Sequence, residues 1–494
     1  MIPETAAWLA MAIPFIGAIP IALTGSKPDV RETITLVTAG LLFLVVMTLV
    51  PDVLAGARPE VTLIEPLSGL PIYLKVEPLG MIFGAVASFL WIVNSIYSIG
   101  YMRGHNEQNQ TRFYVCFAIA LGSTIGVAFA GNMFTLFVFY EVLTLSTYPL
   151  VTHKGDRKAV MGGRTYLGIL LCTSIGLQML AVIWTWTATG TLDFTPGGIL
   201  AGKVEGPEVG ILLFLYMYGI GKAALMPVHR WLPAAMVAPT PVSALLHAVA
   251  VVKAGVFTVV KVVVYVFGID LLAQTAQAQW LLYVAGATII IASIIALNAD
   301  NLKRRLAYST VSQLSYVILG AAILAPISVA GAAIHIAAHA FGKITLFFAA
   351  GSIYTAAHKT EVSQLAGIGR RMPWTMAAFT IGSISMIGVP PTAGFLSKWY
   401  MLLGAMETEQ MVAVGVIVIS TLLNAAYFLP IVYAAFFRSE EEAPAHHTDD
   451  HHEHGEAPLP IVIALMVTAA GTVLMFFFPE IVLNLAQQLV GNGG

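Results

Sequence analysis

Residues 221–255 read GKAALMPVHRWLPAAMVAPTPVSALLHAVAVVKAG, a largely apolar stretch that contains four prolines and two lysines. Proline removes a backbone donor and clashes with the preceding helical turn, so the stretch predicts a helix broken near Lys222. Residues 386–402 read MIGVPPTAGFLSKWYML and repeat the arrangement, with Pro390 and Pro391 ahead of Lys398. Broken helices of this kind are typical of membrane segments through which ions pass.

The rest of the chain is equally apolar. Of its 494 residues, 58% are hydrophobic and 10% are charged, whereas a soluble domain has about a quarter of charged residues. Apolar stretches of the length that crosses a bilayer recur along the chain, so we expect an all-α polytopic membrane protein with about 14 transmembrane helices. The expected spans are residues 6–24, 33–51, 75–100, 111–131, 133–151, 163–187, 209–227, 241–268, 280–298, 306–325, 328–356, 373–403, 411–437 and 459–482.

Several classes of protein are disfavoured by simple features. The first apolar stretch follows only Glu4 and lacks a basic leader, so we expect a retained helix rather than a signal peptide. Cys116 and Cys172 lie in apolar runs and form neither a disulfide framework nor a CxxC motif. A net charge of −2 gives no bias toward nucleic acid. We find no nucleotide, flavin or iron–sulfur motif, and we expect no cofactor and no redox chemistry in this chain.

Basic residues predict the orientation of the helices. Sorted into alternate loops, sixteen Lys and Arg residues fall on one side and three on the other. The positive-inside rule places the larger set in the cytoplasm, so we expect a multi-pass protein of the cell (inner) membrane with both termini on the extracytoplasmic side. The larger set is Lys27, Arg31, Arg103, Arg112, Lys154, Arg157, Lys158, Arg164, Arg230, Lys303, Arg304, Arg305, Lys359, Arg370, Arg371 and Arg438, and the smaller set is Arg58, Lys75 and Lys203.

The two proline breaks lie five helices apart, in helices 7 and 12. This spacing favours two five-helix repeats, which are inverted because five is odd. Proline and glycine are common in membrane helices, so the breaks alone leave the repeat open. The expected organisation is helices 1–3 in residues 1–110, a first repeat of helices 4–8 in 111–268, a second repeat of helices 9–13 in 269–437, a loop in 438–458 and helix 14 in 459–494.

The loop of residues 438–458 is acidic and contains five histidines, in the sequence RSEEEAPAHHTDDHHEHGEAP. Histidine-rich tracts can bind metal. Because this tract has no fixed ligand spacing and no structured frame, we expect a solvated cytoplasmic loop and assign no metal.

Five lysines and one glutamate lie within or at the edges of apolar spans. Such a charge costs at least about 2.5–3.5 kcal/mol, so it needs a partner, a water-filled cavity or a function. Glu141 is the only acid well inside a span, and Lys222 is its best candidate partner. A changing distance between them would make the lysine hold or release a proton, which is a proton switch. A static ion pair that fastens two helices is the alternative.

A second group lies on one expected helix. His335, His339 and Lys343 recur at i, i+4 and i+8 and therefore share roughly one face. Histidine exchanges protons near neutral pH, so the three groups are interpreted as a relay that works through waters. A lone intramembrane histidine would more often be a hydrogen-bonded packing residue.

The remaining candidates are His247, Lys253 and Lys398. His247 and Lys253 are six positions apart and so face different directions, and both are expected to take part in proton transfer. Lys261, further along the same span, could instead snorkel toward an interface. Lys398 lies eight residues after the Pro390–Pro391 break, where unwound backbone meets water, and is the expected terminal proton site and the counterpart of Lys222.

Nearby hydroxyls and amides could hold connecting waters or bond to their own helix backbone. They are Ser146, Thr147, Ser243, Ser309, Thr310, Ser312 and Gln313, and we do not include them among the candidate site residues.

Taken together, these motifs resemble the antiporter-like subunits shared by respiratory complex I, membrane-bound hydrogenases and Mrp-type cation/proton antiporters. The resemblance covers nearly the whole chain and rests on FYEVLTLSTYPL around Glu141, the stretch from Lys222 to Lys253, HIAAHAFGKITLFFAAG and GVPPTAGFLSKWY. It implies fourteen helices, two inverted repeats with broken helices 7 and 12, a Glu–Lys pair on helices 5 and 7, and a hydrated axis of charged residues.

Within that family the chain most resembles the D-type subunits of Mrp sodium/proton antiporters. The lysine of SKWY differs from the glutamate of the middle complex I subunit, and we expect neither a lateral helix nor extra domains after helix 14. The expected partners are other membrane subunits, protons, a monovalent cation such as Na⁺ and the lipid bilayer. No oxygen-only cation site is visible, so the sodium path is expected mainly in partner subunits. A proton-pumping subunit of a complex I-like or hydrogenase assembly and a non-conducting scaffold are the alternatives.

Overall fold

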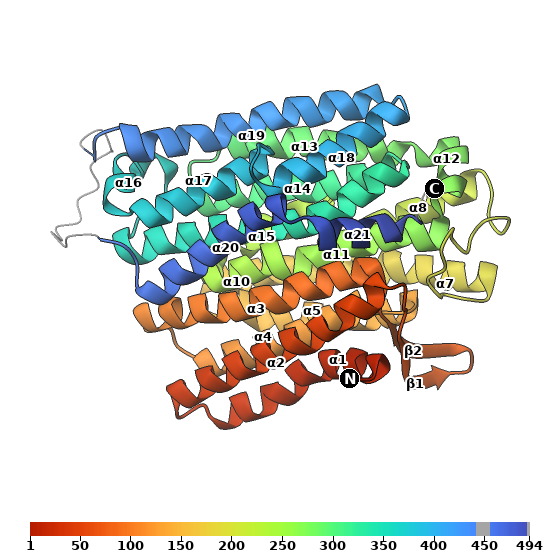
Figure 1. The fold of residues 1–494 in the computed structure, drawn as a ribbon, viewed down its shortest axis with the longest axis horizontal. Helices are drawn as coiled ribbons and strands as arrows, with labels where there is room; N and C mark the ends of the chain where they lie inside the picture. The colour runs from red at the N-terminus through yellow and green to blue at the C-terminus, as the bar shows by residue number, and fades with distance from the viewer. Residues whose placement is uncertain (441–454, 492–494) are drawn as a thin grey trace.

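The computed structural model describes residues 1–440 and 455–491, and Figure 1 shows its helices lying side by side in one bundle. The elements in chain order are α1 (Pro3–Leu23), α2 (Pro28–Leu54), β1 (Glu60–Leu67), β2 (Leu70–Lys75), α3 (Pro78–Gly104), α4 (Gln110–Ala128), α5 (Met133–Val151), α6 (Arg157–Thr173), α7 (Met179–Thr189), α8 (Pro207–Gly219), α9 (Trp231–Ala234), α10 (Thr240–Ala244), α11 (Val251–Lys261), α12 (Ile269–Gln274), α13 (Trp280–Asn298), α14 (Leu302–Ala322), α15 (Pro326–Ala357), α16 (Ile368–Arg371), α17 (Pro373–Ile387), α18 (Ala393–Glu407), α19 (Met411–Phe437), α20 (Leu459–Phe477) and α21 (Glu480–Leu489).

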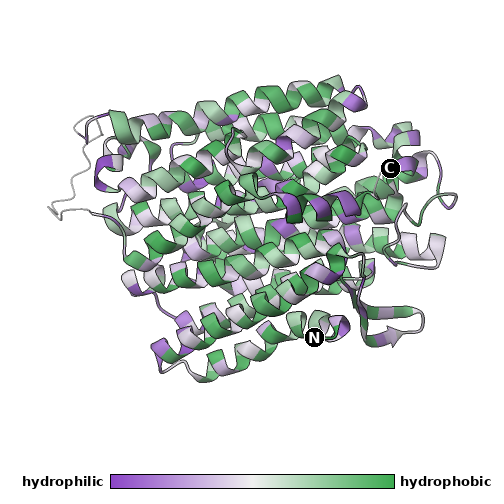
Figure 2. Cartoon of the chain, in the orientation of Figure 1, coloured by the Kyte–Doolittle hydropathy of each residue, from purple (hydrophilic) through white to green (hydrophobic). Residues whose placement is uncertain are grey.

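The long helices confirm a polytopic membrane protein. Within the described residues, eleven helical segments are long and apolar enough to cross a membrane. All fourteen expected ranges contain helix. Eleven of them correspond to these long apolar segments, and the remaining three contain α8, α14 and the pair α17 and α18. Fourteen crossings therefore remain a prediction. Figure 2 shows hydrophobic residues along the lengths of most helices, whereas α21 carries hydrophilic residues along its length.

Local sequence explains where many helices begin. Proline occupies the first turn of α1, α2, α3, α8 and α15, where its missing N–H would have had no intrahelical partner. Asn132, Asp156 and Asn301 cap α5, α6 and α14 by accepting a hydrogen bond from a backbone N–H three residues later. These starts fix the register of the helices that position the site.

A two-stranded antiparallel hairpin precedes α3 and was not predicted. Strands β1 and β2 pair from Glu60 opposite Lys75 to Leu67 opposite Leu70. The helix expected from residue 75 therefore begins only at Pro78. We call this end of the bundle, on the right in Figure 1, the hairpin end.

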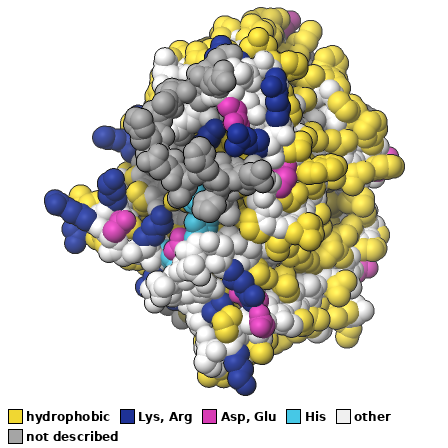
Figure 3. Space-filling view, turned by 90° about the vertical axis from the view of Figure 1, so that its left-hand side faces the viewer, with side chains coloured by type: hydrophobic (Ala, Val, Ile, Leu, Met, Phe, Trp, Pro, Cys, Tyr) yellow, Lys and Arg dark blue, Asp and Glu magenta, His cyan; other side chains and the backbone are white. Residues whose placement is uncertain are grey.

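The opposite end carries much of the larger basic set, and we call it the basic end. Figure 3 looks onto this end and shows many Lys and Arg side chains on it. Contacts join its loops: Arg103 pairs with Asp29 at 2.5 Å, and the Arg112 guanidinium donates to the carbonyl of His153. The expected loop of residues 438–458 lies largely outside the described residues.

The centre of the bundle consists of two helical runs whose most apolar windows are wholly buried. One is α15, and the other extends through α10 and α11 from Thr240 to Phe267. By contrast, the most apolar windows of α1, α2, α19 and α20 are less than half buried. Five of the eight candidate site residues lie on these two central runs. The fold therefore places these five costly polar groups farthest from lipid.

Candidate functional site

The first proline stretch is an unwound segment around Lys222. Helix α8 ends at Gly219, and only 3₁₀ turns and the short α9 follow before α10 begins at Thr240. The Lys222 ammonium is fully buried and donates to the Tyr140 carbonyl at 2.8 Å and to Thr144 Oγ1 at 2.5 Å. It also lies 3.1 Å from the centroid of the Tyr140 ring. Lys222 is thus held by one turn of α5.

That turn also carries Glu141, but the expected ion pair is not formed. No carboxylate–ammonium contact within 4.0 Å joins Glu141 to Lys222 in the described part of the chain. Both carboxylate oxygens of Glu141 are buried without a hydrogen-bond partner there. A buried, unsatisfied carboxylate is costly, so it indicates water or a partner that approaches in another state.

Helix α11 packs directly against the unwound segment. A Cβ atom on Gly255 would lie 2.3 Å from the Lys222 carbonyl carbon and from the Ala223 nitrogen, so only glycine fits. Two residues earlier on α11, the fully buried Lys253 forms a 2.6 Å hydrogen bond with His339 Nδ1 of α15. This bond joins the two central helical runs.

The His247 side chain has no hydrogen bond within the part of the chain that the structure describes. It belongs to a π-helical segment, Leu245–Val249, and its ring centroid lies 4.8 Å from that of Phe347. Both ring nitrogens are buried and unpartnered among the described residues. His247 can therefore bond to waters, the role expected of a relay group.

The stripe on α15 touches three different helices. His335 and His339 have ring centroids 5.9 Å apart, and the Nε2 atoms of both rings lack partners among the residues described. His339 meets α11 through Lys253, His335 Nδ1 lies 2.8 Å from Ser397 Oγ of α18, and the Lys343 ammonium donates to Ser309 of α14 at 2.8 Å. The three polar residues expected on one face of α15 therefore connect this helix with α11, α14 and α18.

The second break is much shorter than the first. Helix α17 ends at Ile387 and α18 begins at Ala393, and Gly388 adopts a φ of +88° that favours glycine. Lys398 on α18 donates to the carbonyl oxygens of Met386 and Ile387 at 2.8 and 3.0 Å. These carbonyls end a helix, a position that attracts positive charge, and the Met386 carbonyl also accepts from the side-chain amides of Gln313 and Asn424.

Several contacts of the candidate residues were missed by the sequence analysis. Tyr140 and Thr144 flank Glu141, and Ser397 precedes Lys398, so proximity in sequence was the one signal that could have found them. Tyr316 lies with its ring centroid 4.5 Å from the Lys398 ammonium, and only the fold shows this. Of the hydroxyls left out of the candidate set, Ser309 accepts from Lys343, whereas Thr147 and Thr310 donate to their own helices.

Lys261 does not snorkel toward an interface. It is fully buried at the end of α11, and its ammonium pairs with the carboxylate of Glu77, the residue before α3. The alternative of snorkelling is therefore wrong. Glu77 was overlooked because it lies at the start of a span rather than inside one.

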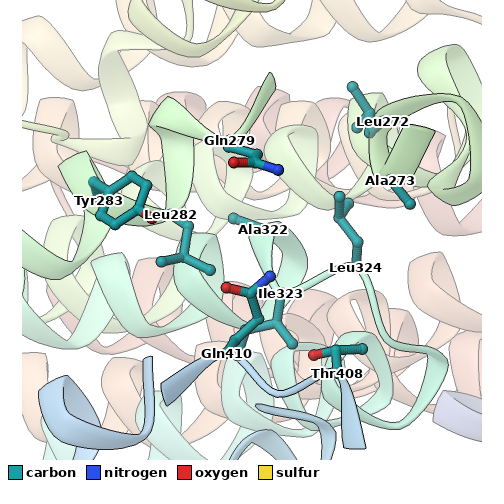
Figure 4. A pocket seen from close by; sticks show the side chains of 10 residues that line it. All are labelled: Leu272, Ala273, Gln279, Leu282, Tyr283, Ala322, Ile323, Leu324, Thr408 and Gln410. Carbon is teal, nitrogen blue, oxygen red and sulfur yellow. The ribbon is translucent and has the colours of Figure 1, made fainter. Parts of the chain in front are cut away.

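Two of the surface cavities formed by the described residues bear on the location of the site. One of about 130 Å³ lies at α12, α13 and the ends of α14 and α18, as Figure 4 shows, and none of the candidate site residues lines it. The other, of about 200 Å³, contains Lys154, Lys303 and Lys359 at the basic end and reaches Thr240, the first residue of α10. Burial lowers the pKa of Lys359 there, although Glu440 opposes the shift.

Known proteins share both the sequence pattern and the fold. A family described as NADH:quinone oxidoreductase/Mrp antiporter, TM, matches residues 130–424. NADH-quinone oxidoreductase subunit N of Desulforudis audaxviator is 32% identical over 426 residues, 84% of this chain and 84% of that protein. A probable K(+)/H(+) antiporter subunit of Rhizobium meliloti is 32% identical over 364 residues, which are 70% of this chain but only 34% of that protein.

A solved structure of the Mrp complex from Dietzia sp. DQ12-45-1b contains a chain with the same fold. It superimposes with a TM-score of 0.86 at 22% identity and covers 100% of this chain and 98% of that one. The family match spans more than half of the residues, including both helix breaks. The chain therefore belongs to the NADH:quinone oxidoreductase/Mrp antiporter family, as an antiporter-like membrane subunit.

Proposed function

We propose that this chain is a proton-translocating, D-type subunit of a multisubunit Mrp antiporter. In this proposal protons move inward along the buried polar residues, and the energy released drives Na⁺ or another monovalent cation outward. The path consists of Glu141, Lys222, His247, Lys253, His335, His339, Lys343 and Lys398. The observation that supports it best is the set of direct contacts through which α15 meets α11, α14 and α18.

Each group on this path has the chemistry that proton transfer requires. Lysine and histidine both gain and lose protons, and the ring nitrogens of His247, His335 and His339 that have no partner among the described residues can bond to waters. Glu141 acts as the gate, because its approach to Lys222 favours the ammonium and its withdrawal favours proton release. The larger basic set faces the cytoplasm in this proposal, which places the hairpin end on the extracytoplasmic side.

We expect the chain to work beside other membrane subunits that contribute the cation path. The solved relative is described as part of an Mrp complex, and the Rhizobium meliloti relative as an antiporter subunit. These descriptions support the proposed assembly. The two five-helix repeats, residues 111–268 and 269–437, belong to the same proposal, with Lys222 and Lys398 as counterparts.

The second candidate function is that of a proton-pumping subunit in a complex I-like assembly. The specific observation in its favour is the relative named NADH-quinone oxidoreductase subunit N, matched over 84% of both chains. Neighbouring genes for flavin or iron–sulfur subunits would favour this function. A gene cluster of membrane subunits alone would favour the antiporter.

The proposal is tested by cation/proton exchange in everted membrane vesicles with the whole complex at matched assembly. Glu141→Ala, Lys222→Ala and Lys398→Ala are each expected to reduce exchange to the level of vesicles without the complex. Lys203→Ala and Glu205→Ala change exposed residues and serve as matched controls. Unchanged exchange in all three site variants would contradict proton transfer and favour a scaffold.

A further inference from the structure

A second lysine–glutamate pair lies at the hairpin end of α11, outside the path described so far. Lys261 follows Lys253 by eight residues, which is about 12 Å along a helix. Its ammonium is fully buried and pairs with the carboxylate of Glu77, of which only 3% is exposed. The pair thus lies on the same helix as the central Lys253, toward the surface.

The pair is covered by a thin layer of chain. The ring of Phe194 lies 4.4 Å from the Lys261 ammonium and that of Tyr265 lies 4.5 Å from it, and both stabilise the positive charge. Phe194 is buried, but its neighbour Asp193 is exposed and accepts a hydrogen bond from the Tyr73 hydroxyl. Phe194, which covers the ion pair, is therefore directly followed toward the N-terminus by a residue that contacts solvent.

Several backbone hydrogen bonds attach this cover to the bundle, among them those of the Met133 N–H to the Leu192 carbonyl at 2.9 Å and of the Leu200 N–H to the Val266 carbonyl at 3.2 Å. The Phe194 N–H donates to the Gly131 carbonyl at 3.1 Å, and the Ile199 N–H donates to the Val266 carbonyl at 2.9 Å. Val266 belongs to a π-helical segment, Val262–Phe267, that begins directly after Lys261. Such irregular segments in helices are frequent at functional sites.

Fastening helices does not by itself require these charges. Removing a carboxylate and an ammonium from water costs several kcal/mol per ion, and well-packed apolar residues of similar volume often stabilise a protein as well or better. A role for the charges themselves explains why a lysine and a glutamate meet at this place, two helical turns from Lys253.

We propose that Lys261 and Glu77 form a proton-exchange pair that connects Lys253 with the solvent at the hairpin end. A proton that leaves the Lys253 ammonium through waters converts the Lys261 amine to an ammonium. Its transfer to Glu77 leaves a neutral amine and a neutral carboxylic acid, and release to water restores the carboxylate. The reverse sequence takes up a proton. This inference rests on the proposed function of the chain.

The decisive variant is Lys261→Arg, measured in the same vesicle assay with the whole complex. Arginine keeps the positive charge and can pair with Glu77, but its guanidinium does not release a proton in proteins. Lys75→Arg is the matched control, because Lys75 pairs with Glu60 at 2.8 Å on the same end but remains partly exposed. We expect Lys261→Arg to assemble normally and lose exchange, and Lys75→Arg to retain both.

Retained exchange in Lys261→Arg would overturn the inference and would mean that Lys261 and Glu77 form a structural ion pair. Should this variant fail to assemble, the apolar double variant Lys261→Met/Glu77→Leu decides the question. Assembly without exchange supports the inference, whereas assembly with exchange, or failure of this variant also to assemble, overturns it. Lys222→Ala is measured in parallel, since its retained exchange would contradict the proposed function itself.

Discussion

The two helix breaks hold their lysines in different ways. At the first break only 3₁₀ turns and the short α9 interrupt the unwound chain from Ile220 to Pro239, and Lys222 lies inside this segment. At the second break only residues 388–392 separate α17 from α18, and Lys398 lies on the resumed helix. A long break lets the lysine contact a neighbouring helix, whereas a short break lets it contact the helix that precedes the break.

The acceptors of the two ammonium groups follow from this difference. Lys222 donates to Tyr140 and Thr144 on α5, the helix that carries Glu141. Lys398 donates to the carbonyls of Met386 and Ile387, which end α17. A shift of α5 would therefore change the surroundings of Lys222 alone. We infer that a carboxylate gate acts at the first break and that the second is a fixed binding place for a proton.

The largest effect on exchange is expected when either break lysine, Lys222 or Lys398, is prevented from releasing its proton. Lys222→Arg and Lys398→Arg keep a positive charge at each break, but the guanidinium stays protonated. Exchange in everted vesicles should fall to background in both variants, while Lys203→Arg on an exposed loop keeps wild-type exchange. Activity in either site variant would mean that the break needs a charge and not a proton.

Glu141→Gln should test whether the first break is gated by a carboxylate, in contrast to the second. The amide keeps the shape of the side chain but removes the negative charge beside Lys222, so the proposed gate is lost. We expect exchange to fall by about tenfold or more, the equivalent of about 1.4 kcal/mol or more. Glu205→Gln, on an exposed loop, is the control. Wild-type exchange in Glu141→Gln would remove the distinction between a gated and a fixed lysine.

Gly255→Ala and Gly388→Ala compare the packing of the two breaks. The new Cβ at residue 255 would meet the main chain of Lys222 at 2.3 Å, whereas at residue 388 it would meet the flexible Lys398 side chain at 2.7 Å. Overpacking against main chain costs about 1–3 kcal/mol, and the strained φ at Gly388 costs about 1–3 kcal/mol. Thermal unfolding of the purified complex should show a loss of stability in both variants. The rate of cation/proton exchange should change only in a variant whose lysine is moved.

The helical Gly415 provides the control for both alanine variants, because no atom of the described residues, other than the adjacent backbone of its own helix, lies within 4 Å of its Cβ position. Gly415→Ala should leave stability and exchange unchanged. If Gly255→Ala behaved in the same way, close contact between α11 and the unwound segment would not be required.

The smallest effect is expected from Thr144→Val. Valine keeps the shape of threonine but removes the hydroxyl that accepts from Lys222, at a cost of about 1–3 kcal/mol for the unsatisfied donor. Exchange should fall several-fold. Thr310→Val is matched to it, since the Thr310 hydroxyl donates to the Leu306 carbonyl of its own helix. Equal effects of the two substitutions would show that the Thr144 contact has no special role.

Much of this fold is predictable because the membrane penalises charge and unpaired backbone so strongly. Buried lysines and proline breaks therefore stand out in the sequence, and the structure has breaks on both sides of Lys222 and ahead of Lys398. Contacts that depend on how distant helices meet are different. The bond between Lys253 and His339 joins residues 86 positions apart, and helical periodicity within either segment gives no information about it.

The hairpin and the Glu77 pair show a second limit. Strands β1 and β2 contain apolar residues beside Glu60 and Lys75, and a search for long apolar helices passes over such short segments. Glu77 begins a helix, where acidic residues are common, so its sequence position suggested nothing unusual. Only the packing of α11 against this end brings Lys261 to it.

The central claim is that both breaks serve one proton path, joined where Lys253 meets His339 at 2.6 Å. Cation/proton exchange by Lys253→Met, in everted vesicles at matched assembly, tests this most directly because Lys222 and Lys398 both remain. Lys203→Met provides the baseline. We predict exchange at background for Lys253→Met. Wild-type exchange would contradict the claim, since protons would then cross without the residue that joins the two breaks.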